Sequence, residues 1–331
     1  MNKYENYIKG AFVGGWCGDA SGALLEFHKN EITLEMVNHA IHMNGGGIFN
    51  VGKGQITDDS ELELAMIHGM LKNNKEIFPY EAICNEYIEW IKSSPFDVGR
   101  TCANAFGTST NLESLLKNAS QLNSESESNG ALMRAVPLAI WGLNLNEEDL
   151  MKIACLDARL SHPNPICQIV NSIYVLVLRH LILKPNDREG ALHLILKYSD
   201  QKPLRIWYKD ALHYENINPR ENIGHIKHAF QLMVYFLNGV NIISNKDGRV
   251  KYEKFDYDYE EVIRRILLLG GDTDTNAKII GALIGAIKGF DNIPDYMKNP
   301  VLNFDCNDGG RMRPEKYLIK NIFGKIDKLY Y

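Results

Sequence analysis

The chain has 331 residues, of which 45% are hydrophobic and 23% are charged. This composition is ordinary for a globular protein and excludes a chain too polar to bury a core. The formal net charge of -5 and the dispersed Lys and Arg residues argue against binding to nucleic acid or to an anionic membrane through bulk charge.

The cysteines and the apolar runs indicate the cellular compartment to expect for the protein. Its six cysteines form no C-x-x-C pair, and most lie among apolar residues, where a free cysteine behaves as a small hydrophobic side chain. We expect a reducing compartment without a disulfide framework or a zinc site. The first residues lack the apolar segment of a secretory signal, and no run reaches the roughly 18 uninterrupted apolar residues of a membrane span. We therefore expect a cytoplasmic protein that does not enter a membrane.

Helical periodicity dominates the chain. Apolar residues recur on one face from near Asp58 to about Leu71, around 83–91, over about 20 residues around 166–177, and around 228–236. Gly, Pro and Asn clusters between these segments are too short to be interdomain linkers. Residues 249–259 alternate weakly and predict a surface loop or a small hairpin. We predict one mainly α-helical domain over residues 1–331.

Two acidic clusters each open a predicted apolar helix. Residues 57–60 read TDDS, and residues 270–276 read GGDTDTN. Either cluster alone could cap its helix, because Asp and Thr accept hydrogen bonds from the first N–H groups and Asp favours the positive end of the helix dipole. Two acid pairs flanked by hydroxyls instead favour hard oxygen ligation of Mg²⁺, Mn²⁺ or Ca²⁺. If the clusters meet, their four carboxylates would need at least one divalent ion, and a pair of metals forms a known catalytic clamp.

The helix after the second cluster carries small residues on one face. They are Gly281, Ala282, Gly285, Ala286 and Gly289. Such a ridge lets another helix approach closely, and we expect the resulting buried helix to hold the loop of Asp272 and Asp274 rigidly.

Motifs around both clusters follow one another in a fixed order. They lie at 10–15 with 18–27 (GAFVGG and GDASGALLEF), 57–60 (TDDS), 97–101 (DVGRT), 128–134 with 137–138 (SNGALMR and PL), 160–163 (LSHP), 270–276 (GGDTDTN) and 289–294 (GFDNIP). In this order they resemble the ADP-ribosylglycohydrolase family over nearly the whole chain. Ser60 stands where Thr is commoner in the family, and Cys102 where many members have a second Thr.

The resemblance implies an all-α orthogonal helical bundle with two Mg²⁺ ions in a cleft, Mn²⁺ being an alternative. The implied metal ligands are Thr57, Asp58, Asp59, Asp272, Asp274 and Thr275. The implied catalytic acids are Asp58, Asp59, Glu26 and Asp272. Glu26 matches a glutamate that lies beside one metal in serine-specific members, and from the sequence alone it could equally be a surface acid.

The resemblance also implies which residues bind the substrate. They are Asp97, Gly99, Arg100, Thr101, Ser128, Asn129, Gly130, Ala131 and His162. Glycine-rich turns present backbone N–H groups to a pyrophosphate, although either turn could be an ordinary one. An aromatic residue should hold the adenine, and Phe96, Trp207 and Tyr214 are equal candidates.

The activity that the resemblance implies is Mg²⁺-dependent hydrolysis that removes ADP-ribose from a modified protein side chain. Linkage to arginine is favoured over linkage to serine, because the form of residues 270–276 resembles that of bacterial members. Two alternatives are hydrolysis of a free metabolite such as an acylated ADP-ribose, and a binding module without catalysis. The segments 28–56, 107–127 and 199–222, where an acceptor would be recognised, match no motif.

Overall fold

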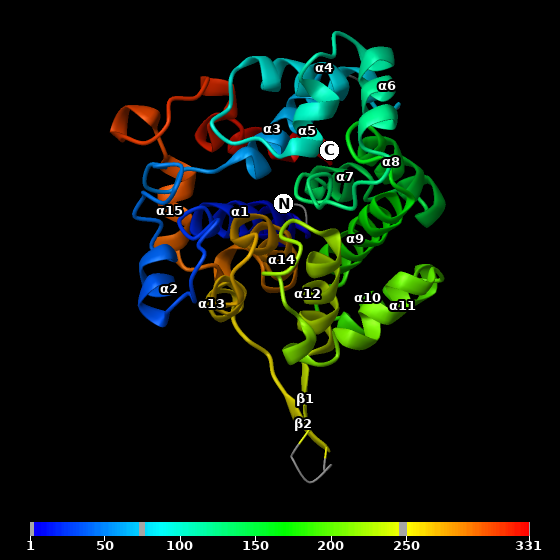
Figure 1. Cartoon of the computed structure of the whole chain (residues 1–331), viewed down its shortest axis with the longest axis vertical. Coiled ribbons are helices and arrows are strands. Elements are labelled where there is room, and N and C mark those ends of the chain that lie inside the picture. Colours follow the sequence, from blue (N-terminus) through cyan, green and yellow to red (C-terminus); the bar gives the residue numbers. More distant parts are fainter. Residues whose placement is uncertain (1–2, 73–76, 245–249, 331) are drawn as a thin grey trace.

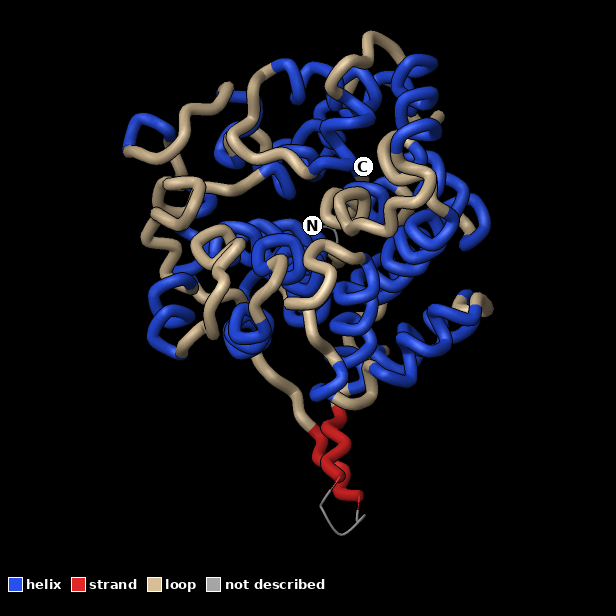
Figure 2. The backbone as a smooth tube through the Cα atoms, in the orientation of Figure 1, coloured by secondary structure: helices blue, strands red, loops and turns tan. Residues whose placement is uncertain are grey.

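The computed structural model describes residues 3–72, 77–244 and 250–330, and these are mostly helical, which confirms the all-α prediction (Figure 2). The α-helices are α1 (Glu5–Gly22), α2 (Leu34–Ala40), α3 (Asp58–Leu71), α4 (Tyr80–Lys92), α5 (Arg100–Phe106), α6 (Leu112–Leu122), α7 (Val136–Trp141), α8 (Glu147–Arg159), α9 (Pro165–Leu183), α10 (Arg188–Tyr198), α11 (Lys202–Asp210), α12 (Ile226–Asn238), α13 (Tyr259–Leu269), α14 (Thr273–Lys288) and α15 (Asp295–Asn303). Short 3₁₀ turns dominate the C-terminal segment after α15.

The four helices predicted from apolar periodicity correspond to α3, α4, α9 and α12. The weakly alternating segment contains β2 (Val250–Lys254), which pairs antiparallel with β1 (Val240–Ser244). This hairpin projects from the helical body (Figure 1). Arg249, the first residue of the predicted segment, lies outside the described residues.

The core is formed by apolar helix faces, and α9 is its most apolar helix. By length and composition α9 could cross a bilayer, yet 67% of its apolar window is buried inside the protein. Its residues pack among α7, α8, α10 and α14. We interpret α9 as a core helix. The six cysteines are unpaired, and all except Cys155 are buried.

At the centre of the fold, α1 lies directly against α14 (Figure 1). Gly10, Gly14 and Gly18 of α1 face Gly285, Gly281 and Ala277 of α14. A Cβ atom added to Gly14 would lie 2.3 Å from the carbonyl oxygen of Gly281, so the two backbones touch without side chains between them. This contact confirms the close approach predicted from the small-residue ridge, and a matching glycine ridge on α1 provides the other half.

The substitution Gly281→Ala should destabilise the protein strongly. The new Cβ would lie 2.4 Å from the carbonyl oxygen of Gly14, and neither backbone can move without shifting a whole helix. Overpacking of this kind costs about 1–3 kcal/mol. Thermal unfolding followed by circular dichroism would measure the loss.

The matched control is Gly324→Ala, because a Cβ on Gly324 meets no atom of the described chain within 4 Å. Its effect should stay within about 0.5 kcal/mol. Equal melting temperatures for the two variants would contradict the proposed backbone contact.

Candidate active site

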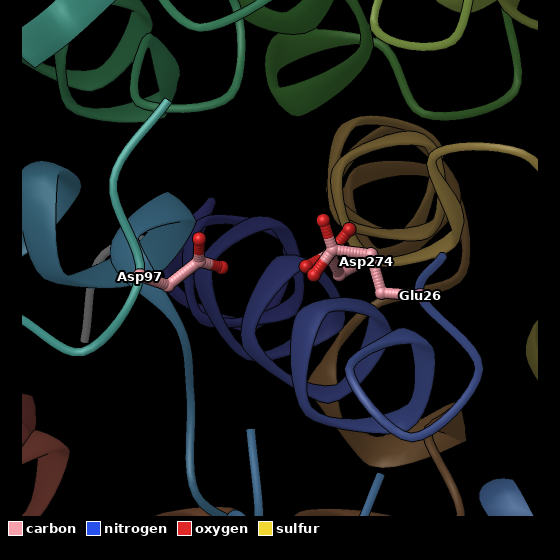
Figure 3. Close-up of side chains that lie close together, drawn as sticks. All are labelled: Glu26, Asp97 and Asp274. Atoms are coloured by element: carbon pink, nitrogen blue, oxygen red, sulfur yellow. The ribbon is translucent and has the colours of Figure 1, made fainter. Parts of the chain in front are cut away.

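A cavity of about 400 Å³ opens where the first turns of α3 and α14 meet the loops that precede α5 and α7. Five carboxyl side chains line it, namely those of Glu26, Asp58, Asp97, Asp272 and Asp274. Figure 3 shows Asp97, from the loop between α4 and α5, facing Glu26 and Asp274. Carboxylate oxygens of these three residues lie within 4.8 Å of one another. The cavity floor therefore gathers acids from four separate chain segments.

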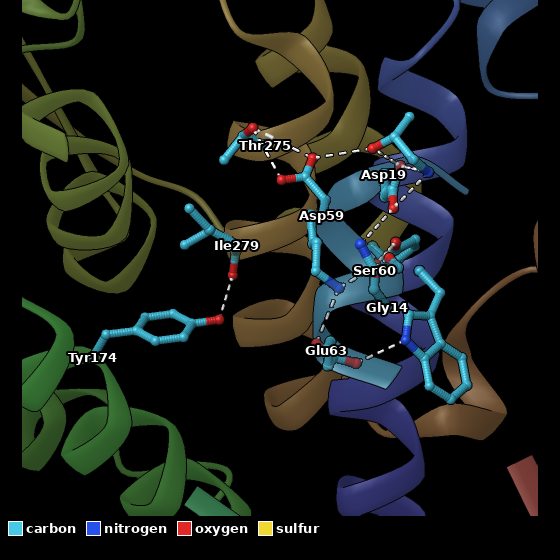
Figure 4. A network of polar contacts seen from close by, with 12 residues as sticks. Gly14, Asp19, Asp59, Ser60, Glu63, Tyr174, Thr275 and Ile279 are labelled. Carbon is cyan, nitrogen blue, oxygen red and sulfur yellow. Dashed lines mark hydrogen bonds and ion pairs between the residues drawn. The ribbon is translucent and has the colours of Figure 1, made fainter. Parts of the chain in front are cut away.

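The two acidic clusters of the sequence meet at this floor. Asp59 lies behind the cavity wall, and the hydroxyl of Thr275 donates to its two carboxylate oxygens at 3.1 and 3.3 Å (Figure 4). The hydroxyl of Thr57 lies 3.5 Å from the nearer oxygen of Asp59. All six residues expected to bind metal are thus close together, and their role as ligands stays a prediction.

Helix capping, the alternative interpretation of these clusters, is confirmed for the positions of the residues that begin the two helices but not for their side-chain hydrogen bonds. Thr57 and Asp272 occupy the N-cap positions, but within the described chain neither side chain makes a capping hydrogen bond. The hydroxyl of Thr57 donates to Asp19 at 3.0 Å, and Asp272 accepts from the Asn129 side-chain amide at 2.7 Å.

Asp19 of α1 is a residue that the sequence analysis did not select. It is fully buried and accepts hydrogen bonds from the backbone N–H groups of Thr57 and Ser60. It thereby takes over the capping of α3 from another helix, which holds the turn of Asp58 and Asp59 against α1 (Figure 4). The only available signal was its position inside the matched motif at 18–27.

Helix α3 carries four buried acids, and two of them have a buried cation. Glu61 accepts a bidentate pair of hydrogen bonds from Arg313 at 2.7 and 2.8 Å, and a third from the Trp90 indole. Glu63 accepts from Lys278 at 3.0 Å. No such partner reaches Asp58 or Asp59 among the described residues, so the charges of these two acids are not compensated by a cation of the described chain.

The pKa values reflect this crowding of acids. Burial, followed by the charge of Asp97, raises the pKa of Glu26 to about 10. Burial and the charge of Asp58 raise the pKa of Asp97 to about 9. Burial, opposed by the Gly99 backbone hydrogen bond and reinforced by the charge of Asp19, raises the pKa of Asp58 to about 7. The pKa values of Asp59 and Asp274 also lie well above the usual range, because each is buried beside other carboxylates.

This donor set fits a divalent cation. The groups are carboxylates and hydroxyls only, which are hard oxygen ligands of the kind that Mg²⁺ and Mn²⁺ take. One carboxylate oxygen of Glu26, Oε2, is buried and has no hydrogen-bond partner within the described chain. Positive charge placed among these acids would relieve their mutual repulsion.

The opposite wall of the cavity has no acid among its described lining residues and is rich in hydroxyls. The hydroxyls of Thr101, Ser126 and Ser128 lie within 2.9–3.1 Å of one another. The Nε2 atom of His162 lies 2.9 Å from Ser128 Oγ, and its Nδ1 lies 2.7 Å from Ser161 Oγ. Burial, with the nearby charge of Arg134, lowers the pKa of His162 to about 3, so the ring is neutral at pH 7.

The structure places almost all the predicted substrate residues on the cavity wall. Those that line it are Asp97, Gly99, Arg100, Thr101, Ser128, Asn129, Gly130 and His162. Ala131 is fully buried next to this loop and is not one of the lining residues described. Gly99 donates its backbone N–H to Asp58 at 3.2 Å, which ties this wall to the acidic floor.

None of the three candidate adenine aromatics is among the described lining residues. Trp207 is packed against His225 and Phe230, and Tyr214 against Tyr235. The aromatic residue at the cavity is Phe27, which the sequence analysis did not single out. Ser126, Ile223 and Gly224 were also missed, because loop residues carry no periodic signal.

With the site in view, the family can be stated. The ADP-ribosylglycohydrolase family model matches residues 1–327. The chain belongs to this family and is a glycosyl hydrolase.

Individual relatives agree with this assignment. The chain is 30% identical to the ADP-ribosyl-[dinitrogen reductase] glycohydrolase of Rhodospirillum rubrum over 86% of each protein. It is 29% identical to an Acanthamoeba polyphaga mimivirus protein named as an ADP-ribosyl glycohydrolase, over 97% of each. It is 23% identical to the ADP-ribosylarginine hydrolase Tri1 of Pseudomonas putida (strain GB-1), over 86% of this chain and 71% of that protein. A solved structure titled as an ADP-ribosylglycohydrolase-related protein complex shares the fold, with a TM-score of 0.71 at 20% identity, covering 100% of this chain and 99% of that one.

The depressed pKa of His162 should make folding pH-dependent. In the unfolded chain a histidine takes up a proton near pH 6.5, whereas the folded chain resists it down to about pH 3. Acid therefore favours the unfolded state. The contribution of His162 to the free energy of unfolding is complete above pH 6.5 and declines as the pH falls. Between pH 7 and pH 5 the free energy of unfolding should fall by about 2 kcal/mol because of His162.

The variant His162→Gln keeps a donor and an acceptor but does not titrate. Subtracting its free energies of unfolding from those of the unaltered protein isolates His162 from the other titrating groups. Denaturant unfolding at pH 5, 6 and 7 provides these values. Parallel pH profiles would show that His162 is protonated normally in the folded state.

Proposed function

We propose that this protein is a Mg²⁺-dependent hydrolase that removes ADP-ribose from modified arginine side chains of proteins. The observation that carries the proposal is the convergence of Asp58, Asp272 and Asp274 with Glu26 and Asp97 at one end of a cavity whose other end has hydroxyls and Arg100 but no acid among its described lining residues. Two bacterial relatives are named as ADP-ribosylarginine hydrolases, which supports arginine as the acceptor.

The two ends of the cavity suit the two ends of an ADP-ribosyl arginine. The hydroxyls of Thr101 and Ser128, with the neighbouring Arg100, can bind a pyrophosphate, whereas the amide of Asn129 already donates to Asp272. The acidic end suits the distal ribose and a guanidinium, which prefers carboxylates and an aromatic face. The carboxyl groups there belong to Glu26 and Asp97, and the aromatic face is the ring of Phe27. A serine acceptor has no charge that would use them.

In the reaction the bond between ribose C1″ and the guanidinium nitrogen breaks, and its electron pair leaves with the nitrogen. The ribosyl carbon gains oxocarbenium character, which nearby carboxylates stabilise. A water oxygen then bonds to C1″. Asp58 or Glu26, which line the cavity, would take the proton of this water, and the leaving nitrogen would gain one. Asp59, which is not among the described lining residues, would serve as a metal ligand and not as the base.

Asp58, Asp59, Asp272 and Asp274, with Thr57 and Thr275, would hold the metal. When bound, Mg²⁺ would supply Lewis acidity and a template for hydroxyl groups and water.

The double variant Asp272→Ala/Asp274→Ala should lose both turnover and metal binding. Release of ADP-ribose from an ADP-ribosylarginine peptide should fall by at least about 100-fold, because a metal-ligand loss removes several kcal/mol. Added Mg²⁺ should raise the melting temperature of the unaltered protein and leave that of the variant unchanged. Asp200→Ala, on an 83% exposed side chain, is the control. Undiminished turnover of the double variant would refute the proposed role of these acids.

A panel of substrates with different linkages would test which acceptor residue the enzyme releases from ADP-ribose. Peptides carrying ADP-ribose on arginine, serine or glutamate, together with an acylated ADP-ribose, should be assayed with Mg²⁺ and with EDTA. We expect the highest kcat/KM for the arginine peptide, because only its leaving group is a cation in an acidic site. Faster turnover of the acylated metabolite would instead favour a free small molecule as substrate.

A further inference from the structure

Three aromatic rings form a continuous row that begins at the cavity mouth. Phe27 lines the cavity and contacts Phe49 edge-on at 6.2 Å between ring centroids. Phe49 contacts Phe96 at 5.9 Å, and the guanidinium of Arg311 lies 5.7 Å from the centre of the Phe96 ring. We call Phe27, Phe49, Phe96 and Arg311 the rim. It starts beside Glu26, at the acidic end of the cavity.

The rim is apolar surface partly open to solvent. Phe27 is 49% exposed, and Phe49 and Phe96 are half-buried. The side chains next to Phe49 and Arg311 in sequence, those of Ile48 and Met312, are 67% and 73% exposed and extend the apolar surface. Phe27 also has a positive φ of 55°, which is rare for a bulky residue and costs about 1–3 kcal/mol. A strained backbone that presents an exposed ring at a cavity mouth is typical of a binding position.

Buried polar contacts hold the rim segments in place. Gln55 accepts from the backbone N–H of Arg311 at 2.8 Å and donates to its carbonyl at 2.7 Å. Arg313 donates to the carbonyl of Ser93 at 2.9 Å, three residues before Phe96, while its other nitrogens bind Glu61. These bonds tie the C-terminal segment to α3 and to the loop of Asp97. The Arg311 side chain is therefore presented from a fixed backbone.

The turn that carries Phe49 is fixed as well. Gly46 and Val51 exchange backbone hydrogen bonds at 2.8 and 2.9 Å. Gly47 has a φ of +68°, and a Cβ there would lie 2.8 Å from the carbonyl oxygen of Ala23. Only glycine lets this turn lie against the end of α1, which brings Phe49 to Phe27.

We propose that the rim is the docking surface for the polypeptide that carries the modified arginine, and that it selects an apolar residue and an acidic residue next to that arginine. The proposal rests on the proposed function, which places the ADP-ribosyl arginine in the cavity. Whatever is attached to the leaving group has to emerge at the acidic end, where the rim begins. The rings provide apolar contact area, and the exposed Arg311 complements an acidic side chain.

The test compares binding of ADP-ribose alone with binding of a hydrolysis-resistant ADP-ribosyl peptide that has Leu and Glu beside the modified arginine. Calorimetry with Mg²⁺ would measure both dissociation constants. The unaltered protein should bind the peptide about tenfold more tightly than ADP-ribose. Phe49→Ala should remove most of this advantage and leave the affinity for ADP-ribose unchanged. The control Tyr252→Ala, on a 69% exposed aromatic of β2, should change neither value.

A charge exchange provides an independent readout if Phe49→Ala disturbs folding. Arg311→Glu should weaken binding of the Glu peptide several-fold and strengthen binding of a matched Lys peptide. Equal affinities for ADP-ribose and both peptides in the unaltered protein would overturn the proposal. Peptide selectivity without turnover of any linkage would refute the proposed function and support the rim as a docking surface.

Discussion

The backbone contact between α1 and α14 is the constraint on which the site depends. A Cβ on Gly22, the last residue of α1, would lie 2.3 Å from the Cα of Asp274. The hydroxyl of Thr273 also donates to the carbonyl of Gly22 at 2.8 Å. Because the two helices touch here, Asp19 can cap α3 from one side while Asp274 approaches from the other. Glu26 follows four residues after Gly22 and therefore reaches the same floor. If side chains separated these helices, the acids would be several ångströms further apart.

The electrostatics of α3 show how one helix can carry four buried acids. Glu61 and Glu63 are neutralised by Arg313 and Lys278, and such fully hydrogen-bonded pairs are tolerated in a protein interior. Asp58 and Asp59, one turn earlier, receive hydrogen bonds but no cation from the described chain. The helix therefore has two acids that are paired with cations and two that are not. Of the unpaired acids, Asp58 lines the cavity and Asp59 lies behind its wall. A metal site in this position uses charge that folding has left uncompensated.

Much of this architecture could be predicted from the sequence, and the missing part has a physical reason. The helices around 58–71 and 166–177 were predictable because burial on one face imposes a period on apolar residues. The acid clusters were recognisable because two acid pairs flanked by hydroxyls each open an apolar helix. Asp19 was missed because its partners are 38 and 41 residues away, and no local pattern reports such a contact. The same holds for Phe27, Phe49 and Arg311, which come from three loops and meet only in space.

The contact between α1 and α14 also bears on how the chain becomes folded. Its two halves are separated by more than 250 residues, as the contact of Gly281 with Gly14 illustrates. During synthesis the glycine ridge of α1 emerges long before its partner, and loop-closure entropy opposes the pairing of such distant segments. Arg313 joins later still, because it follows α14 in the sequence. We therefore expect nascent chains to lack the complete acidic floor until α14 has left the ribosome, so that catalytic competence is acquired late in folding.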